Sequence, residues 1–116
     1  MNDWIPIAAA SECLPGASIE RLAGGRMVAI ANVDGTLHAI DGLCSHQGGP
    51  LGTGHLCGTV LTCPWHGWQF VVVTGRHRLS ATVRQQVHEI REQNGQLYVR
   101  LAADASGADR TVEPHA

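Results

Sequence analysis

The sequence predicts an all-β protein, a sandwich or barrel of short antiparallel strands. Short apolar runs are separated by turn residues at regular intervals, and no stretch shows the apolar spacing of an amphipathic helix. Asp34-Gly35 and Asn94-Gly95 are the dipeptides most typical of two-residue hairpins, because a type I′ turn needs positive φ at both central residues. The length of 116 residues suits one domain with one modest core.

The strands follow from the apolar runs between turns. Turns are expected at 14–16, at Gly24-Gly25 and at Thr74-Gly75. Residues 76–86 are polar and give no clear assignment. Residues 1–102 form the expected domain, and residues 103–116, rich in Ala, Asp, Ser and Gly, are expected to be a flexible tail. The expected strands are 4–9, 17–22, 27–33, 36–40, 59–62, 68–73, 87–92 and 96–101.

Composition excludes several classes of protein. A net charge of −2 is too balanced for nucleic-acid binding driven by bulk charge. The first residues lack the basic start and long apolar run of a signal peptide, and no stretch reaches the length of a membrane span. We therefore expect a soluble cytoplasmic protein that binds neither nucleic acid nor membrane. In a reducing compartment Cys13 and Cys57 are not expected to form a disulfide.

Two stretches carry metal-ligating residues, Cys44-Ser45-His46 and Cys63-Pro64-Trp65-His66. Each supplies one thiolate and one imidazole, and sixteen residues separate His46 from Cys63. Two cysteines and two histidines are the ligand set of a [2Fe–2S] cluster with the cysteines on one iron and the histidines on the other. A structural zinc ion is the alternative, but zinc sites usually pair like ligands, a Cys-x-x-Cys knuckle with a His-x-His hook. Because each of the two stretches supplies one cysteine and one histidine, the pattern favours the cluster over a zinc ion.

The segments around these residues, DGLCSHQGGPLGTG (41–54) and TCPWHGWQF (62–70), resemble the two cluster-binding loops of Rieske-type [2Fe–2S] ferredoxins, the low-potential soluble carriers of bacterial oxygenase systems. The resemblance implies an antiparallel β-sandwich with a small cluster-binding subdomain formed by two loops. It also implies one [2Fe–2S] cluster, bound by Cys44, His46, Cys63 and His66. The residues expected to surround the cluster or a docked partner are Gln47, Gly48, Trp65, Gly67 and Trp68.

The resemblance also implies a low reduction potential. High-potential Rieske proteins carry a Ser and a Tyr where this chain has Trp68 and Phe70, and a disulfide where it has Gly49 and Trp65. Both absences place the potential at the low end of the Rieske range, on the order of −150 mV. Phe70 is interpreted mainly as a core residue and Trp65 as a surface residue.

This chain departs from the family pattern in two places. It has Val71 where many members have Asp, and its segment 76–84 has no proline where many members have a proline-containing loop over the cluster. The three arginines of that segment are interpreted as solvent-exposed residues of a loop, and contact with an acidic partner is the alternative.

These features together predict an electron carrier and not an enzyme. The resemblance implies that it takes electrons from an NAD(P)H-dependent flavoprotein reductase and passes them to a terminal, ring-hydroxylating-type oxygenase. The alternatives are the small Rieske subunit of an assimilatory nitrite reductase and, more remotely, a structural zinc-binding module. The chain shows no 2-His-1-carboxylate iron site of the oxygenase kind. The remaining histidines, His38, His55, His77, His88 and His115, are interpreted as surface or core residues.

Overall fold

The computed structural model describes residues 3–44, 48–65, 67–80 and 82–102. These ranges contain short antiparallel strands and two single-turn 3₁₀ helices, η1 (Ala10–Glu12) and η2 (Leu51–Thr53), and no α-helix. The strands are β1 (Ile5–Ala9), β2 (Ser18–Ala23), β3 (Arg26–Val33), β4 (Thr36–Asp41), β5 (His55–Cys57), β6 (Val60–Thr62), β7 (Gln69–Val71), β8 (Val87–Gln93) and β9 (Gln96–Arg100).

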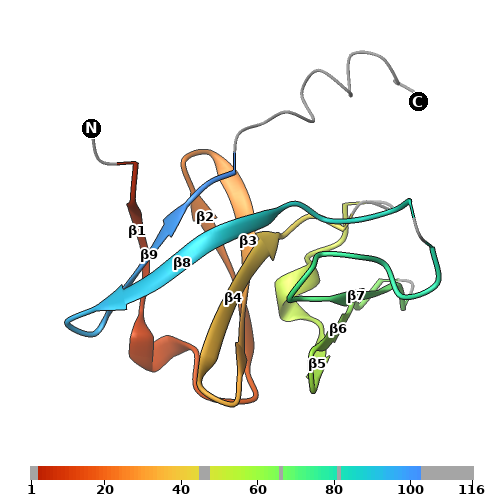
Figure 1. The fold of residues 1–116 in the computed structure, drawn as a ribbon, viewed down its shortest axis with the longest axis horizontal. Coiled ribbons are helices and arrows are strands. Elements are labelled where there is room, and N and C mark those ends of the chain that lie inside the picture. The colour runs from red at the N-terminus through yellow and green to blue at the C-terminus, as the bar shows by residue number, and fades with distance from the viewer. Residues whose placement is uncertain (1–2, 45–47, 66, 81, 103–116) are drawn as a thin grey trace.

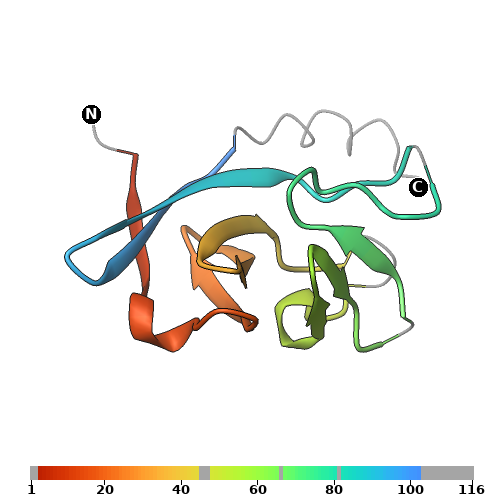
Figure 2. The ribbon, with the colours of Figure 1, turned by 60° about the horizontal axis from the view of Figure 1, so that its bottom comes forward.

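The larger sheet has six strands in the order β1-β9-β8-β4-β3-β2. It folds over, so that β1, β9 and β8 lie across β2, β3 and β4 (Figures 1 and 2). Apolar side chains from both halves fill the space between them. The buried members of this core are Ala8, Cys13, Ala23, Val28, Ile30, Ala39, Leu97 and Val99. The all-β antiparallel sandwich predicted from the sequence is confirmed.

The smaller sheet, β5-β6-β7, packs against the outer face of the larger one (Figure 1). Strand β3 is buried on both faces, because successive side chains along a strand point to opposite sides. Val28 and Ile30 face the sandwich core, whereas Ala29 and Ala31 face the second core under the smaller sheet. That second core also contains Ile40, Cys44, Leu51, Leu61, Cys63, Phe70 and Val72.

Both predicted hairpin turns are present. Asp34 and Gly35 have φ values of 52° and 94°, and Asn94 and Gly95 have 54° and 81°. Positive φ at both central residues is the type I′ requirement. The flanking pairs Val33↔Thr36 and Gln93↔Gln96 close the hairpins with the expected two-residue loops.

Three features differ from the sequence prediction. Strand β5 was not predicted, because its three residues lie between Gly54 and Gly58 and carry too short a pattern. Strand β7 is three residues long instead of the six expected over 68–73. The unassigned segment forms an arch through the isolated pairs Arg76↔Arg84 and Phe70↔His77. The predicted tail, 103–116, lies outside the described residues. Among the described residues, no helix has the length and hydrophobicity to cross a membrane.

Candidate iron–sulfur site

The two ligand-bearing loops have the same pattern of backbone hydrogen bonds, which we call the loop frame. In the first loop the N–H of Cys44 donates to the Gly49 carbonyl at 2.8 Å, and the N–H of Gly48 donates to the Cys44 carbonyl at 2.7 Å. In the second loop the N–H of Cys63 donates to the Trp68 carbonyl at 2.8 Å, and the N–H of Gly67 donates to the Cys63 carbonyl at 3.1 Å. Each cysteine therefore opens a loop closed by the residues four and five positions later.

The flanks of the loops match as well. Leu43 pairs with Pro50 at the base of the first loop, and Thr62 pairs with Gln69 at the base of the second. The fifth position of each frame is a glycine with positive φ, 77° at Gly48 and 76° at Gly67. That backbone conformation strains any residue with a Cβ atom, which explains the glycine in both loops. The frames differ in where the histidine falls, because it is the third residue of the first loop and the fourth residue of the second when each cysteine is counted as the first.

The two loops meet at Gly49. A Cβ atom on Gly49 would lie 2.9 Å from the Cys63 sulfur and 2.9 Å from Cγ of Trp65. The first loop therefore passes directly over the thiol and the indole of the second loop. Gly49 and Trp65 are the positions where high-potential relatives carry a disulfide, and here an indole–backbone contact joins the loops instead.

Both cysteines are buried, with 3% of their surface exposed, and neither forms a disulfide. Cys13 and Cys57 are also free, as the sequence predicted. Two buried thiols in matched loops fit a cluster that takes two thiolates on one iron, because soft thiolate ligands suit iron–sulfur centres. The predicted ligands His46 and His66 and the predicted neighbour Gln47 lie outside the described residues. Among the described residues no group of three or more His, Cys, Asp and Glu side chains could hold a metal ion.

The aromatic residues in and just after the second loop differ in exposure, as the sequence predicted for Trp65 and Phe70. Trp65 is 55% exposed, whereas Phe70 is fully buried in the core. Trp68 is half-buried and contacts the His77 ring edge-on, with 4.6 Å between the ring centroids. His77 also contacts Phe70 edge-on at 5.3 Å, and Trp68 and Phe70 lie 6.5 Å apart, so the three rings form one cluster. The sequence placed His77 only as a surface or core residue, and its position beside Trp68 was not predicted.

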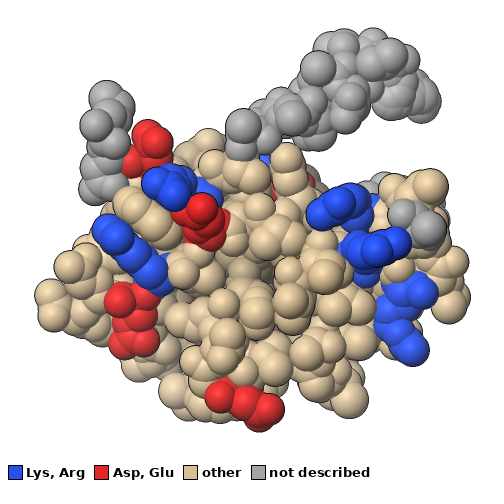
Figure 3. Space-filling model, in the orientation of Figure 1, with Lys and Arg blue, Asp and Glu red and all other residues tan. Residues whose placement is uncertain are grey.

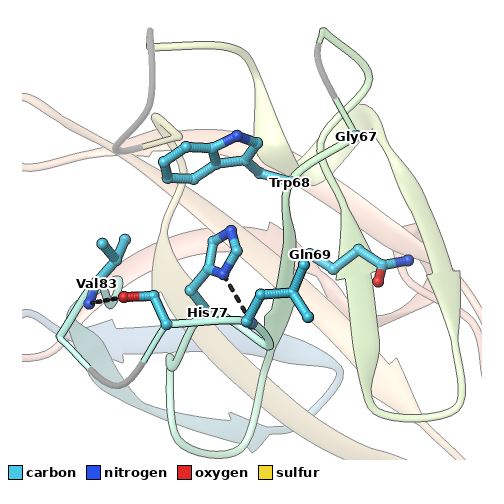
Figure 4. Close-up of a pocket in the computed structure, with 7 residues that line it drawn as sticks. Gly67, Trp68, Gln69, His77 and Val83 are labelled. Carbon is cyan, nitrogen blue, oxygen red and sulfur yellow. Dashed lines mark hydrogen bonds between the residues drawn. The ribbon is translucent and has the colours of Figure 1, made fainter.

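A groove runs between the second loop and the arch formed by residues 76–80 and 82–84. It has a volume of about 520 Å³. In Figure 4 the Trp68 indole lies above the His77 imidazole. The arch is held by two hydrogen bonds drawn there, from the Leu79 N–H to His77 Nδ1 and from the Val83 N–H to Ser80 Oγ. The groove is lined by Gly67, Trp68, Gln69, His77, Leu79, Ser80 and Val83.

Gln85 anchors the backbone directly before the first loop, a role that the sequence did not reveal. Its side chain is buried, and Nε2 donates to the Asp41 carbonyl at 2.9 Å and to the Leu43 carbonyl at 2.7 Å. Leu43 directly precedes Cys44. A glutamine in a polar stretch carries no pattern that distinguishes it from a solvated residue, so only the fold identifies it.

Asp41 is further fixed through its side chain. Its carboxylate accepts hydrogen bonds from the buried His88 at 2.9 Å and from Arg26 at 3.1 Å. Because His88 Nδ1 accepts the N–H of Ala102, the proton that His88 shares with Asp41 lies on Nε2. Burial alone would raise the pKa of Asp41, but His88 and Arg26 outweigh it and lower that pKa.

Glu20 supports the other end of the first loop. Its Oε1 accepts the N–H of Gly52 at 2.7 Å, and its Oε2 is buried without a hydrogen-bond partner. A Cβ atom on Gly42 would lie 2.6 Å from Oε2, so the carboxyl group fits against glycine backbone at both ends of the segment. Burial raises the pKa of Glu20 to about 7.

Comparison with known proteins identifies the family. The family model described as "Rieske [2Fe-2S] domain" matches residues 3–99. The chain therefore belongs to the Rieske [2Fe–2S] domain family, and its cofactor is a Rieske-type [2Fe–2S] cluster. This finding confirms the resemblance seen in the two loop sequences.

Ferredoxins of dioxygenase systems are among the relatives. The chain is 35% identical over 99 residues to "Ferredoxin CarAc" of Metapseudomonas resinovorans, over 83% of this chain and 92% of that protein. It is 34% identical over 84 residues to the ferredoxin component of the naphthalene 1,2-dioxygenase system of Pseudomonas putida, over 72% of this chain and 80% of that protein. A solved complex of reduced oxygenase and oxidised ferredoxin in carbazole 1,9a-dioxygenase contains a chain with a TM-score of 0.74 and 31% identity, over 90% of this chain and 100% of that one.

Proposed function

We propose that this protein is a one-electron carrier that delivers electrons to a terminal oxygenase of the ring-hydroxylating type. The observation that carries the proposal is the pair of matched loops, which present two buried cysteines at one end of a Rieske fold. Two relatives that match most of this chain are ferredoxin components or ferredoxins of oxygenase systems, and a ferredoxin–oxygenase complex is known for a similar chain.

Each residue of the site has a distinct part in this proposal. Cys44 and Cys63 bind one iron as thiolates, and His46 and His66 bind the other. The cluster supplies one-electron redox chemistry when bound. Gly48 and Gly67 allow the loops to turn closely around it, and Trp65 covers the junction at Gly49.

The electron donor is proposed to be an NAD(P)H-dependent flavoprotein reductase in the cytoplasm. We propose that this chain itself transforms no substrate. The small Rieske subunit of a nitrite reductase stays the second candidate. No observation on the described residues favours it or the zinc module over the oxygenase carrier.

Single-turnover transfer tests the proposal. The protein is reduced with dithionite, freed of excess reductant, and mixed without oxygen with the oxidised oxygenase component of the carbazole 1,9a-dioxygenase system. We expect one electron per chain to pass to the oxygenase, and we expect the reduced protein alone to form no product from carbazole and oxygen. Transfer to an assimilatory nitrite reductase with none to the oxygenase would reject the proposal.

A further inference from the structure

We propose that the cluster-bearing end of this protein docks onto an acidic face of its redox partner, through three arginines of the segment that carries the exposed Leu79. The inference deepens the proposed function and rests on it, because it names the chemistry of the partner surface for the same site. The arginines are Arg76, Arg78 and Arg84.

The charge of the chain is divided sharply along the sequence. Residues 42–88 contain these three arginines and no Asp or Glu, a formal charge of +3. The whole chain has ten acidic and eight basic residues, a net charge of −2, so the remainder carries −5. Residues 42–88 also include both ligand loops and the arch. The segment that contains both ligand loops and the arch is therefore cationic, although the chain as a whole is anionic.

The structure gathers the three arginines on one side. Arg76 and Arg84 are paired across the base of the arch, and Arg78 donates to the Gln69 side chain at 2.8 Å. All three are exposed. Figure 3 shows blue side chains without red over the side where the 76–84 arch lies in Figure 1, whereas red and blue are mixed on the opposite side.

These arginines also differ in their contacts from the other arginines among the described residues. Arg21, Arg26 and Arg100 each form an ion pair with a carboxylate of the chain, and Arg91 lies over the Trp4 ring at 4.3 Å. Within the described ranges, Arg76, Arg78 and Arg84 form no ion pair with an acidic residue. A guanidinium group binds a carboxylate through two parallel hydrogen bonds, so this surface matches clustered Asp and Glu side chains on a partner.

The position of the arch makes it part of the electron-transfer face. His77, between Arg76 and Arg78, contacts Trp68, which closes the frame of the second ligand loop. Leu79 is 88% exposed, so a large apolar side chain faces solvent directly after Arg78. The exposed Trp65 adds a second large apolar group in the second ligand loop itself. Arg76 and Arg78 line the same surface groove as Leu79. Exposed apolar side chains next to arginines are typical of a protein-docking surface.

The rate of oxidation by small charged oxidants tests the inference. The reduced holoprotein gives one electron either to hexacyanoferrate(III), a trianion, or to tris(phenanthroline)cobalt(III), a trication. Between about 10 mM and about 150 mM salt the screening length falls from about 30 Å to about 8 Å. We expect the rate with the trianion to fall about tenfold over this range and the rate with the trication to rise. The net charge of −2 alone predicts the opposite signs.

Matched variants locate the effect. The variant R76Q/R78Q/R84Q should reverse the salt dependence with the trianion, and R76E/R78E/R84E should reverse it more strongly. The variant R21Q/R91Q/R100Q removes the same total charge from strands β2, β8 and β9 of the larger sheet and should keep the wild-type signs. A wild-type rate with the trianion that rises with salt, or equal effects of the two Gln variants, would overturn the inference.

Peptide binding gives a second readout that involves no electron transfer. Hexaglutamate added to the oxidised holoprotein at low salt should shift the amide NMR signals of residues 76–80 and 82–84, and hexalysine should not. Shifts confined to other parts of the chain would contradict the proposed surface. A protein that accepts no electron from dithionite would defeat the proposed function, whereas a reducible protein without these charge effects would defeat this inference alone.

Discussion

Replacing Gln85 by leucine should loosen the first ligand loop. The change keeps most of the side-chain volume but removes the donor that reaches the carbonyls of Asp41 and Leu43 at 2.9 and 2.7 Å. Each of the two part-buried acceptors left without its donor costs about 1–3 kcal/mol, so we expect a loss of about 2–6 kcal/mol in the free energy of unfolding. With a urea dependence of about 2 kcal/mol per molar, the midpoint should fall by about 1–3 M.

Gln96 provides a matched control at the far end of the larger sheet. Its Nε2 also donates to two carbonyls, those of Ala8 at 2.9 Å and Leu97 at 3.1 Å. Urea titrations followed by far-UV and visible circular dichroism separate global stability from the environment of the cluster. Gln85→Leu should lower the iron content and alter the visible spectrum, and Gln96→Leu should lower only stability. Unchanged iron content and midpoint in Gln85→Leu, or equal cluster loss in both variants, would refute the role given to Gln85.

Three further predictions concern the same end of the molecule. Gly49→Ala should cost about 1–3 kcal/mol and lower the iron content, because its Cβ would lie 2.9 Å from the Cys63 sulfur. Gly58→Ala, in open space at φ 61°, should cost only backbone strain of about 1–2 kcal/mol. Urea midpoints and iron analysis compare the two variants, and equal behaviour would contradict the contact at Gly49. Burial raises the pKa of Glu20 from 4.5 to about 7, so the folded state holds a proton that the unfolded state releases, and stability should fall as pH rises between these values. Relative to Glu20→Gln the fall should be about 1–2 kcal/mol after allowance for solvent access. Parallel pH profiles of the two proteins would reject this prediction. The reduction potential should be on the order of −150 mV and should rise in W68S/F70Y, and a wild-type potential above zero in a redox titration would contradict the low-potential assignment.

Local chemistry decided which parts of the fold the sequence could predict. Asp34-Gly35 and Asn94-Gly95 specify their turns within two residues, so both hairpins were predicted with nearly correct ends. The unbroken apolar run of β3 identified a strand but not its two cores, because the division between Ala29 and Ile30 depends on a second sheet that is distant in sequence. Strand β5 has three residues, too few for a periodic pattern.

The same distinction holds for the site. Cysteine and histidine at fixed spacing identify a cluster from sequence, because metal ligation needs few residue types in few arrangements. The supports of the loops, Gln85 and Glu20, act through backbone groups 30–45 positions away, where any donor or acceptor of suitable reach would serve. Such residues have no sequence pattern, and their roles follow only from the folded geometry. The ligand roles of His46 and His66 stay predictions.

The ligand assignment is tested most directly by EPR spectroscopy of the purified protein before and after dithionite, with iron and acid-labile sulfide counted on the same sample. The account predicts two irons and two sulfides per chain and a signal that appears only on reduction, with the low average g value of a histidine-ligated [2Fe–2S] centre. In His46→Cys or His66→Cys that g value should shift toward the all-cysteine type, or the cluster should be lost. A colourless, EPR-silent protein with one zinc ion per chain would contradict the account.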